Sequence, residues 1–355
     1  MIESGERFPA FFDRDCKLII SIWLTIRSRY DKIMDMSVKQ DVLKVLEKRR
    51  GESVSGEELA DELGVSRAAV WKAVKGLKAE GHAIHAATNR GYLLEEDSDV
   101  LTAPSVQRFL THDFDVIVEK KVTSTNDAAK KLALGGAKEW TVILSEEQSA
   151  GRGRFARSFY SPRGAGIYCS VVLRPTYTAA ETLFITTCAA VAVAEGIERV
   201  TGRSADIKWV NDVFVSGKKV CGILTEASFS VENGGLEYAV LGFGINVKTQ
   251  AFPAELANVA AALYPDGECS GDTRAKLVAC ILERFRYYYE NIPVRAFYPE
   301  YKRRSILIGK TVLVTGGESG EAEVLDIDEN CYLRVRFADG RECPLSSGEV
   351  SVKIQ

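Results

Sequence analysis

The stretch that governs the rest of the chain reads Gln148-Ser-Ala-Gly-Arg-Gly-Arg-Phe-Ala-Arg157 and directly follows a β-type run, Trp140-Thr-Val-Ile-Leu144. Glycine lets a ligand approach the backbone closely, and the forked donors of arginine suit carboxylate and phosphate oxygens. We therefore predict a loop that binds an anion. Taken alone, the stretch fits a flexible basic surface loop equally well, and the other motifs of the chain decide between these two interpretations.

Length and composition indicate a multidomain protein of the cytosol. With 355 residues the chain is long for one domain, and we expect two or three. The net charge of −3 indicates no global affinity for nucleic acid, so any DNA-binding face must be local. The eight cysteines form no Cys-x-x-Cys pair and do not cluster with the three histidines. This pattern favours free thiols over a zinc site or a disulfide framework, and we expect no bound metal cluster and a cytoplasmic location.

Residues 1–36 fit poorly with the sequence that follows. Their apolar run, Leu18-Ile-Ile-Ser-Ile-Trp-Leu-Thr-Ile26, is too short to span a bilayer. Acidic residues precede the run and no small-residue cleavage site follows it, which argues against a signal peptide. We interpret residues 1–36 as an atypical extension or an over-extended start, and we expect no membrane attachment.

Residues 37–98 show the pattern of a small DNA-binding domain. Ser55-Gly-Glu-Glu58 is a capping box for a short helix, Gly64 supplies a turn, and Ser66 can cap a second helix over 67–77. A two-stranded wing follows, and the second helix of such a pair enters the major groove. The predicted DNA contacts are Ser66, Arg67, Ala68, Trp71, Lys72, Lys75 and Arg90. The alternative is a helical bundle for protein contacts, but cap, turn, basic helix and wing together favour DNA binding.

An α/β domain is expected over residues 104–300, with polar groups at the ends of its strands. Ser124, Thr125 and Asn126 lie where strand periodicity changes to helical periodicity. One such residue suffices to cap a helix, so three leave hydroxyl and amide groups to face a ligand.

A second polar set interrupts the apolar run Asp206-Ile-Lys-Trp-Val-Asn-Asp-Val-Phe-Val215, which we interpret as a strand. It contains Lys208, Asn211 and Asp212. A half-buried lysine is costly unless it is paired or used. A purely structural ion pair between Lys208 and Asp212 is the alternative to a ligand site.

In their order along the chain, these motifs resemble the biotin–protein ligases. The set comprises Ser124-Thr-Asn126, Gln148 with Gly151-Arg-Gly-Arg154, Lys208-Trp-Val-Asn-Asp212, Cys221-Gly-Ile-Leu224 and Gly242-Phe-Gly-Ile-Asn246. With the helix-turn-helix in front, the chain resembles the bifunctional form that also represses the biotin operon. The resemblance extends from Ser37 to the C-terminus. The family usually has proline at Val210 and tryptophan at Phe159.

The resemblance implies an α+β multidomain fold. It implies a winged helix-turn-helix, a central ligase domain of the class II synthetase-like type, and an SH3-like barrel over residues 305–355. It also implies the reaction. Biotin and MgATP give biotinyl-5′-adenylate and pyrophosphate, and the adenylate then acylates a lysine of a biotin carboxyl carrier protein of acetyl-CoA carboxylase or a related carboxylase. Further implied partners are operator DNA of biotin genes and a second copy of the chain, which dimerises when the adenylate is bound.

The implied roles of individual residues follow the family motifs. Biotin binding is assigned to Ser124, Thr125, Asn126, Gln148, Gly151, Arg152, Gly153, Arg154, Lys208 and Gly222. ATP or adenylate binding is assigned to Arg154, Arg157, Phe159, Asn211, Asn246 and Lys353. Catalysis is assigned to Lys208, Arg152, Arg154 and Asp212, with Asp212 helping to deprotonate the acceptor lysine. Because a carboxylic acid is already ionised at neutral pH, the first step needs no histidine base.

Two other functions remain open. The chain could be a ligase whose N-terminal domain does not regulate, or a biotin-sensing transcription factor without ligase activity. Retention of Arg152, Arg154 and Lys208 argues against the second. A lipoate ligase shares the fold class, but the Gly-Arg-Gly-Arg loop points to biotin.

Overall fold

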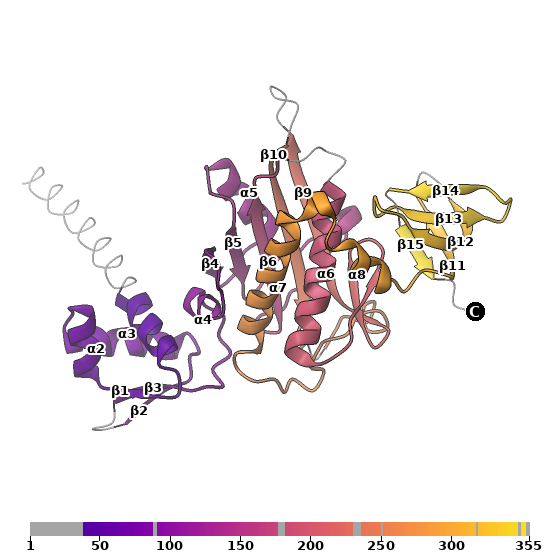
Figure 1. Ribbon diagram of the computed structural model, residues 1–355. Coiled ribbons are helices and arrows are strands. Elements are labelled where there is room, and N and C mark those ends of the chain that lie inside the picture. Colours follow the sequence, from indigo (N-terminus) through magenta and orange to yellow (C-terminus); the bar gives the residue numbers. More distant parts are fainter. Residues whose placement is uncertain are drawn as a thin grey trace, which may run out of the picture. The chain divides into compact units, whose positions relative to one another are not determined.

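The structure is a computed structural model that describes residues 38–87, 91–176, 182–229, 236–249, 251–316, 319–346 and 349–352. Contacts divide the chain into two units, and the break falls between Ser98 and Asp99. Figure 1 shows the elements of both units. The extension at residues 1–36 and two predicted site residues, Arg90 and Lys353, lie outside the described residues. The domain limits 37–98, 104–300 and 305–355 stay predictions.

The first unit contains a helix-turn-helix and a small sheet, as predicted. After a helix at 38–48 come β1 (Ser53–Val54), α2 (Gly56–Leu63), α3 (Arg67–Ala79), β2 (Ile84–Ala87) and β3 (Gly91–Leu94), in the sheet order β1-β3-β2. Ser55 Oγ accepts a hydrogen bond from Glu58 N at 3.0 Å, and Ser66 Oγ accepts one from Ala69 N at 3.2 Å. Both predicted caps are therefore confirmed. Gly64 has a φ of 63° at the turn, a conformation that glycine adopts without strain.

A mixed sheet forms the centre of the second unit. Its strands, in spatial order, are β4 (Asp115–Glu119), β5 (Thr141–Ser145), β6 (Gly166–Leu173), β10 (Leu236–Asn246), β9 (Lys218–Phe229), β8 (Asp212–Val215) and β7 (Asp206–Lys208). β4 and β5 are parallel, and the other pairs are antiparallel. Since β6 and β10 are buried along almost their whole length, both faces of the sheet must be covered.

Helices cover the two faces unequally. The helices and 3₁₀ turns of this unit are α4 (Ala103–Gln107), α5 (Thr125–Leu134), η1 (Arg154–Ala156), α6 (Thr182–Thr201), α7 (Thr273–Glu290), η3 (Ile292–Val294) and α8 (Tyr298–Arg303). α6 and α7 pack side by side on one face, while α5 covers the other (Figure 1). The strand β5 shows the alternation behind this arrangement, because Val142 faces the α6 and α7 side and Ile143 faces α5.

The run 206–215 is a hairpin rather than the single strand that its apolar pattern indicates. Ile207 of β7 pairs with Val213 of β8, and the chain turns between them. Trp209 Nε1 donates to the carbonyl oxygen of Cys331 at 2.9 Å, and Tyr301 OH donates to the carbonyl oxygen of Val210 at 3.0 Å. These contacts come from segments about a hundred residues further along the chain, so local periodicity could not indicate the turn.

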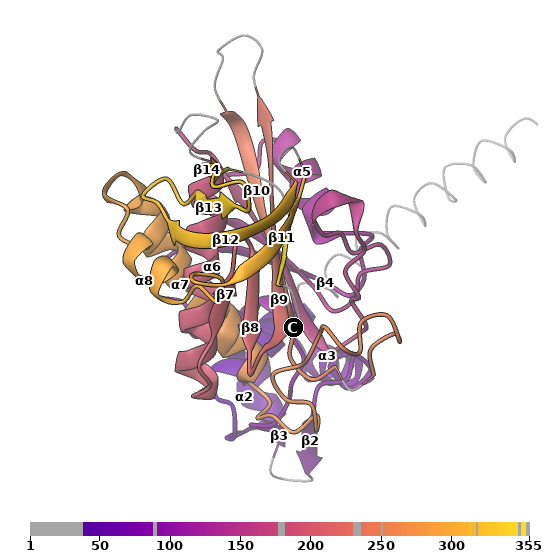
Figure 2. The ribbon, with the colours of Figure 1, turned by 90° about the vertical axis from the view of Figure 1, so that its right-hand side faces the viewer.

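A small antiparallel sheet closes the chain, as expected for the predicted barrel. It consists of β11 (Thr311–Thr315), β12 (Gly320–Ile327), β13 (Leu333–Phe337), β14 (Glu342–Leu345) and β15 (Glu349–Val352), in the order β14-β13-β12-β11-β15 (Figure 2). Its buried residues Val312, Val324 and Val335 belong to the same apolar cluster as α6 and α7. The expected α+β fold with a helix-turn-helix, a central α/β domain and a C-terminal β domain is thus confirmed.

A buried arginine joins three distant segments of the second unit. Arg274 on α7 is 2% exposed, and its Nε lies 3.0 Å from Asp99 Oδ1. Its Nη1 lies 2.9 Å from Glu146 Oε2, and Lys248 Nζ lies 2.5 Å from the other oxygen of Asp99. Burial lowers the pKa of Arg274, but the charges of Glu146 and Asp99 outweigh this effect and leave the pKa raised.

Among the described residues, no helix combines the length and the apolar character needed to cross a bilayer.

Candidate functional site

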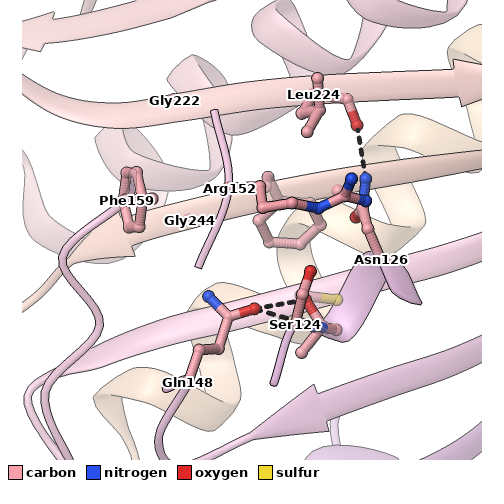
Figure 3. A pocket seen from close by; sticks show the side chains of 12 residues that line it. Ser124, Asn126, Gln148, Arg152, Phe159, Gly222, Leu224 and Gly244 are labelled. Carbon is pink, nitrogen blue, oxygen red and sulfur yellow. Dashed lines mark hydrogen bonds between the residues drawn. The ribbon is translucent and has the colours of Figure 1, made fainter. Parts of the chain in front are cut away.

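A pocket lies between the start of α5, the loop that follows β5, and the strands β6, β9 and β10 (Figure 3). The pocket is narrow and open to solvent, and the space between its walls, open solvent included, is about 310 Å³. The residues that line it are Ser124, Thr125, Asn126, Gln148, Arg152, Phe159, Cys169, Gly222, Leu224, Gly242, Phe243 and Gly244. Seven of these were predicted as site residues. The lining as a whole comes from five separate segments, so the fold brings residues of three strands, one helix and one loop to a single cavity.

The first turn of α5 presents polar groups to this pocket. Ser124 occupies the N-cap position but makes no capping hydrogen bond with its side chain. Instead, Gln148 Oε1 accepts from Thr125 N at 2.8 Å and from Thr125 Oγ1 at 3.1 Å (Figure 3). The side-chain amide of Gln148 thus accepts from the backbone N–H at the start of α5. The Ser124 hydroxyl is therefore not needed as a cap.

Two buried serines extend this hydrogen-bonded network, and neither was predicted from sequence. Ser170 of β6 is fully buried, and its Oγ lies 2.6 Å from Asn126 Oδ1 and 2.8 Å from Thr125 Oγ1. Gln148 Nε2 donates to Ser161 Oγ at 2.8 Å. Ser170 could have been found in the sequence from its hydroxyl within the apolar run 167–173. A buried hydroxyl requires a hydrogen-bond partner.

Glycines allow the close contacts of this network. A Cβ on Gly242 would lie 2.0 Å from Asn126 Oδ1, and one on Gly151 would lie 2.6 Å from Ser161 Oγ. On Gly244 a Cβ would lie 2.5 Å from Cε1 of the Phe159 ring. Phe159, predicted to bind nucleotide, thus packs on the glycine backbone of β10 inside the pocket.

Two carboxylates hold the first loop arginine. Arg152 Nη2 lies 2.7 Å from Asp127 Oδ1 and 2.8 Å from Glu226 Oε2. Glu226 also accepts from Asn126 Nδ2 at 2.8 Å, and its other oxygen lies 2.5 Å from Lys130 Nζ. Neither Glu226 nor Lys130 was predicted as a site residue. The predicted anion-binding side chain of Arg152 is therefore engaged with acidic residues of the protein itself.

Burial alone would raise the pKa of the Glu226 carboxyl. The hydrogen bonds from Lys130 and Asn126, with the charges of Lys130 and Arg152, outweigh burial and hold this pKa below its usual value. Glu226 is consequently a carboxylate at neutral pH.

The second group of cations lies where β8 and β9 meet. Arg154 Nη1 donates to Asn211 Oδ1 at 3.0 Å, and Asn211 Nδ2 donates to the carbonyl oxygen of Ile223 at 2.8 Å. Lys219 Nζ lies 2.7 Å from Asp212 Oδ1. A Cβ on Gly222, which lines the pocket, would lie 3.5 Å from the same Nζ atom. Lys219 was not predicted, although it precedes Gly222 by three residues on the same strand.

Other predicted residues lie outside the pocket lining. Lys208 pairs with Asp212 as a backbone neighbour across the β7–β8 hairpin, whereas the ion pair found at Asp212 is with Lys219. Gly153 and Arg157 close a turn in the loop, where Gly153 N donates to Arg157 O at 2.7 Å. Asn246 is buried at the end of β10, opposite Gly166.

In the first unit, the predicted DNA-contacting face is exposed. Six of the predicted contact residues are exposed to solvent: Ser66, Arg67, Ala68, Trp71, Lys72 and Lys75. Trp71 is 57% exposed, and Lys75 Nζ lies 5.1 Å from its ring centroid. The opposite face of α3 is apolar, since Val70, Val74 and Leu77 are buried in the core of this unit. A large aromatic ring beside basic side chains on an exposed helix suits contact with a polyanion.

Comparisons with known proteins match all three parts of the chain. Residues 118–246 match the Biotin/lipoate A/B protein ligase family, residues 38–93 match an HTH domain, and residues 307–353 match the Biotin protein ligase C terminal domain. The bifunctional ligase/repressor BirA of Bacillus spizizenii is 35% identical over 273 residues, which cover 75% of this chain and 82% of that protein. BirA of Escherichia coli is 27% identical over 307 residues, covering 85% and 94%.

A solved structure shares the fold of the second unit. The biotin protein ligase from Aquifex aeolicus, in complex with biotin and ATP, matches with a TM-score of 0.58 at 24% identity. The match covers 68% of this chain and 99% of the other. At this level of identity, the likeness concerns the fold alone.

Proposed function

The chain belongs to the biotin protein ligase family, among the bifunctional ligase/repressors, and from this premise we propose that it joins biotin to a carrier protein and represses biotin genes. The observation that carries the proposal is the pocket itself. Its polar end, formed by Thr125 and Gln148, suits a cyclic urea, and the rings of Phe159 and Phe243 supply apolar walls. The cations Arg154 and Lys219 lie at the edge near Gly222, where a carboxylate on a short chain would end.

In the first step, a carboxylate oxygen of biotin attacks the α-phosphorus of ATP, and pyrophosphate leaves. Two anionic groups must approach each other, so the main requirement is positive charge held in advance at the reacting atoms. Arg154, Lys219 and Lys208 are the cations that we assign to this role, and no general base is needed.

Mg²⁺ would arrive with the nucleotide and would compensate phosphate charge when bound. Asp212, with Asn211 beside it, fits this ion, because proteins hold Mg²⁺ through one or two carboxylates and the substrate phosphates.

In the second step, the neutral ε-amine of a carrier lysine attacks the acyl carbon of biotinyl-5′-adenylate. The new amide bond forms, AMP leaves with the electron pair of the broken acyl–phosphate bond, and the amine loses a proton. We assign the acceptance of this proton to Asp212, which lies in an ion pair with Lys219. The implied acceptor is the biotin carboxyl carrier protein of acetyl-CoA carboxylase or a related carboxylase.

Repression uses the first unit. We propose that α3 enters the major groove of operator DNA and that two copies of the chain bind a two-fold site when the adenylate is present. We place both activities in the cytoplasm, because the seven cysteines among the described residues are all free thiols.

One experiment tests both halves of this proposal. Labelled biotin is incubated with the protein, MgATP and a carrier domain, and in parallel a mobility shift is run on candidate operator DNA with and without biotin plus ATP. Labelled carrier and a ligand-dependent shift are expected. Labelled carrier without any shift would leave a ligase with a non-regulatory first unit, whereas a shift without labelled carrier would leave a biotin-sensing transcription factor.

Substituting Gly242→Ala is expected to weaken biotin binding about tenfold or more. The new methyl group would overlap Asn126 Oδ1, and forcing an extra methyl group into a packed site costs about 1–3 kcal/mol. The measurement is the biotin dissociation constant by titration calorimetry. Gly135→Ala is the control, because the new Cβ would meet only the backbone carbonyl oxygens of Lys131 and Leu132, at 3.4 Å, and no side chain of the pocket. Unchanged affinity in Gly242→Ala would contradict the assignment of this pocket to biotin.

Substituting Arg67→Ala is expected to weaken operator binding and to reduce the salt dependence of binding. Arg67 is exposed at the first turn of α3, and each lost phosphate contact lowers the slope of log K against log salt by about one. Mobility shifts over a range of salt concentrations measure this slope. Lys310→Ala removes an exposed charge from the second unit and serves as the control. Equal slopes for both variants would argue against α3 as the DNA-contacting helix.

A further inference from the structure

We propose that Asp127 and Glu226 form an acidic catch that closes the loop over the pocket by holding Arg152, with Glu226 as a positioning residue for biotin. The proposal rests on the biotin-ligase function proposed above and assigns Arg152 a different task within it. In this view the arginine anchors the loop, and its charge is not directed at the substrate anion.

Geometry is the first argument for the acidic catch. The two carboxylates approach the same nitrogen of Arg152 at 2.7 and 2.8 Å, one from α5 and the other from β9. The loop tip between Gly151 and Phe159 folds back on itself, because Phe159 N donates to Gly151 O at 2.8 Å, and Arg154 joins it to Asn211. Arg152 therefore ties this turn to two further elements, α5 and β9.

Charge is the second argument. Two cations, Arg152 and Lys130, face the two carboxylates of the acidic catch, so the cluster as a whole is neutral. A neutral cluster adds little attraction for a substrate carboxylate or phosphate.

The third argument is that the same carboxylate orients a pocket residue. Asn126 Nδ2 donates to Glu226 Oε2 at 2.8 Å and to the carbonyl oxygen of Leu224 at 3.3 Å, while its Oδ1 lies 2.6 Å from the Ser170 hydroxyl. The amide of Asn126 is thus held with nitrogen toward β9 and oxygen toward β6. Loop closure and the orientation of Asn126 consequently depend on one side chain, Glu226.

Solvent weakens the ion pairs of the acidic catch, so we expect only moderate effects of its loss on biotin binding. The side chains of Arg152, Asp127 and Glu226 retain 38%, 40% and 23% exposure, and partly exposed ion pairs are individually weak. Glu226→Gln keeps an acceptor for Asn126 and removes the charge that attracts Arg152. We expect about a three- to tenfold rise in the KM for biotin, a similar rise in the rate at which the adenylate escapes, and transfer from saturating preformed adenylate within about twofold of the unaltered protein.

A double-mutant cycle separates the acidic catch from general destabilisation. Glu226→Gln and Arg152→Gln are expected to have similar effects on the KM for biotin, and the double variant is expected to be no worse than either. Arg152→Lys should recover part of the loss. Asp326→Asn, which removes a comparably exposed ion pair with Lys302 on the C-terminal sheet, is the matched control and should leave the KM unchanged.

Proteolysis of the loop tests the acidic catch without any substrate. Trypsin should cleave the ligand-free loop after Arg154 or Arg157 about three- to tenfold faster in Glu226→Gln than in the unaltered protein or in Asp326→Asn. If the unaltered protein forms no adenylate, the proposed function fails while the cleavage rates still decide the role of Glu226. Equal cleavage rates, or effects of Glu226→Gln and Arg152→Gln that multiply in the double variant, would overturn the inference.

Discussion

Lys219→Ala is expected to slow the formation of biotinyl-5′-adenylate by about two to three orders of magnitude. Lys219 Nζ lies close to Gly222 of the pocket lining and 2.7 Å from Asp212, and the proposed role assigns it contact with both the substrate carboxylate and the phosphate. Removing one preorganised charge or donor from a developing anion costs about 3–4 kcal/mol in the transition state. Rapid-quench measurement of adenylate with saturating biotin and MgATP gives this rate directly.

The matched variants are Lys208→Ala and Lys219→Arg. Lys208 belongs to the motif that the sequence favours and lies on β7; neither lysine is among the lining residues, but Lys219 Nζ lies close to Gly222, which is. We therefore expect Lys208→Ala to cost less than Lys219→Ala, and Lys219→Arg to recover part of the rate because it keeps the charge. If Lys208→Ala slowed adenylate formation more than Lys219→Ala, Lys208 would be the main cation of the first step.

Arg274→Met is expected to destabilise the second unit by about 3–5 kcal/mol. The substitution leaves the carboxylates of Asp99 and Glu146, whose side chains are 14% and 13% exposed, without their shared buried cation. Lys248 compensates Asp99 in part, so Glu146 carries most of the cost. Urea unfolding followed by tryptophan fluorescence measures the change in the free energy of unfolding.

Arg284→Met is the control for this comparison, because it lies on the same helix and also pairs with a glutamate. Its side chain is 33% exposed, and exposed pairs contribute only about 0–1 kcal/mol. If both variants lost the same stability, burial of Arg274 would not be the cause of its effect.

Sequence alone predicted the local features that depend on residues close together in the chain. The caps at Ser55 and Ser66 and the turn at Gly64 follow from residue types within four positions of each other, and the structure confirms them. Among the pocket residues, Thr125 could be predicted from the polar groups at the change from strand to helix, and Gln148 and Gly222 from the family motifs.

Long-range partners account for what was missed. Glu226 meets Asn126 across one hundred positions of sequence, and no periodicity connects them. The sequence did not indicate Lys219, because Lys208 is the lysine of the family motif and the ion pair of Lys219 with Asp212 depends on how β8 and β9 pair. Sequence pattern thus identified the chemistry of the site more reliably than the partner of each charged group.

The central claim is that this pocket activates biotin with ATP, and biotin-dependent exchange of labelled pyrophosphate into ATP tests it most directly. The exchange reports adenylate formation alone and needs neither the carrier protein nor DNA. We predict exchange that requires biotin and MgATP and that lipoate does not support. Absence of exchange with biotin, or exchange with lipoate in its place, would contradict the account.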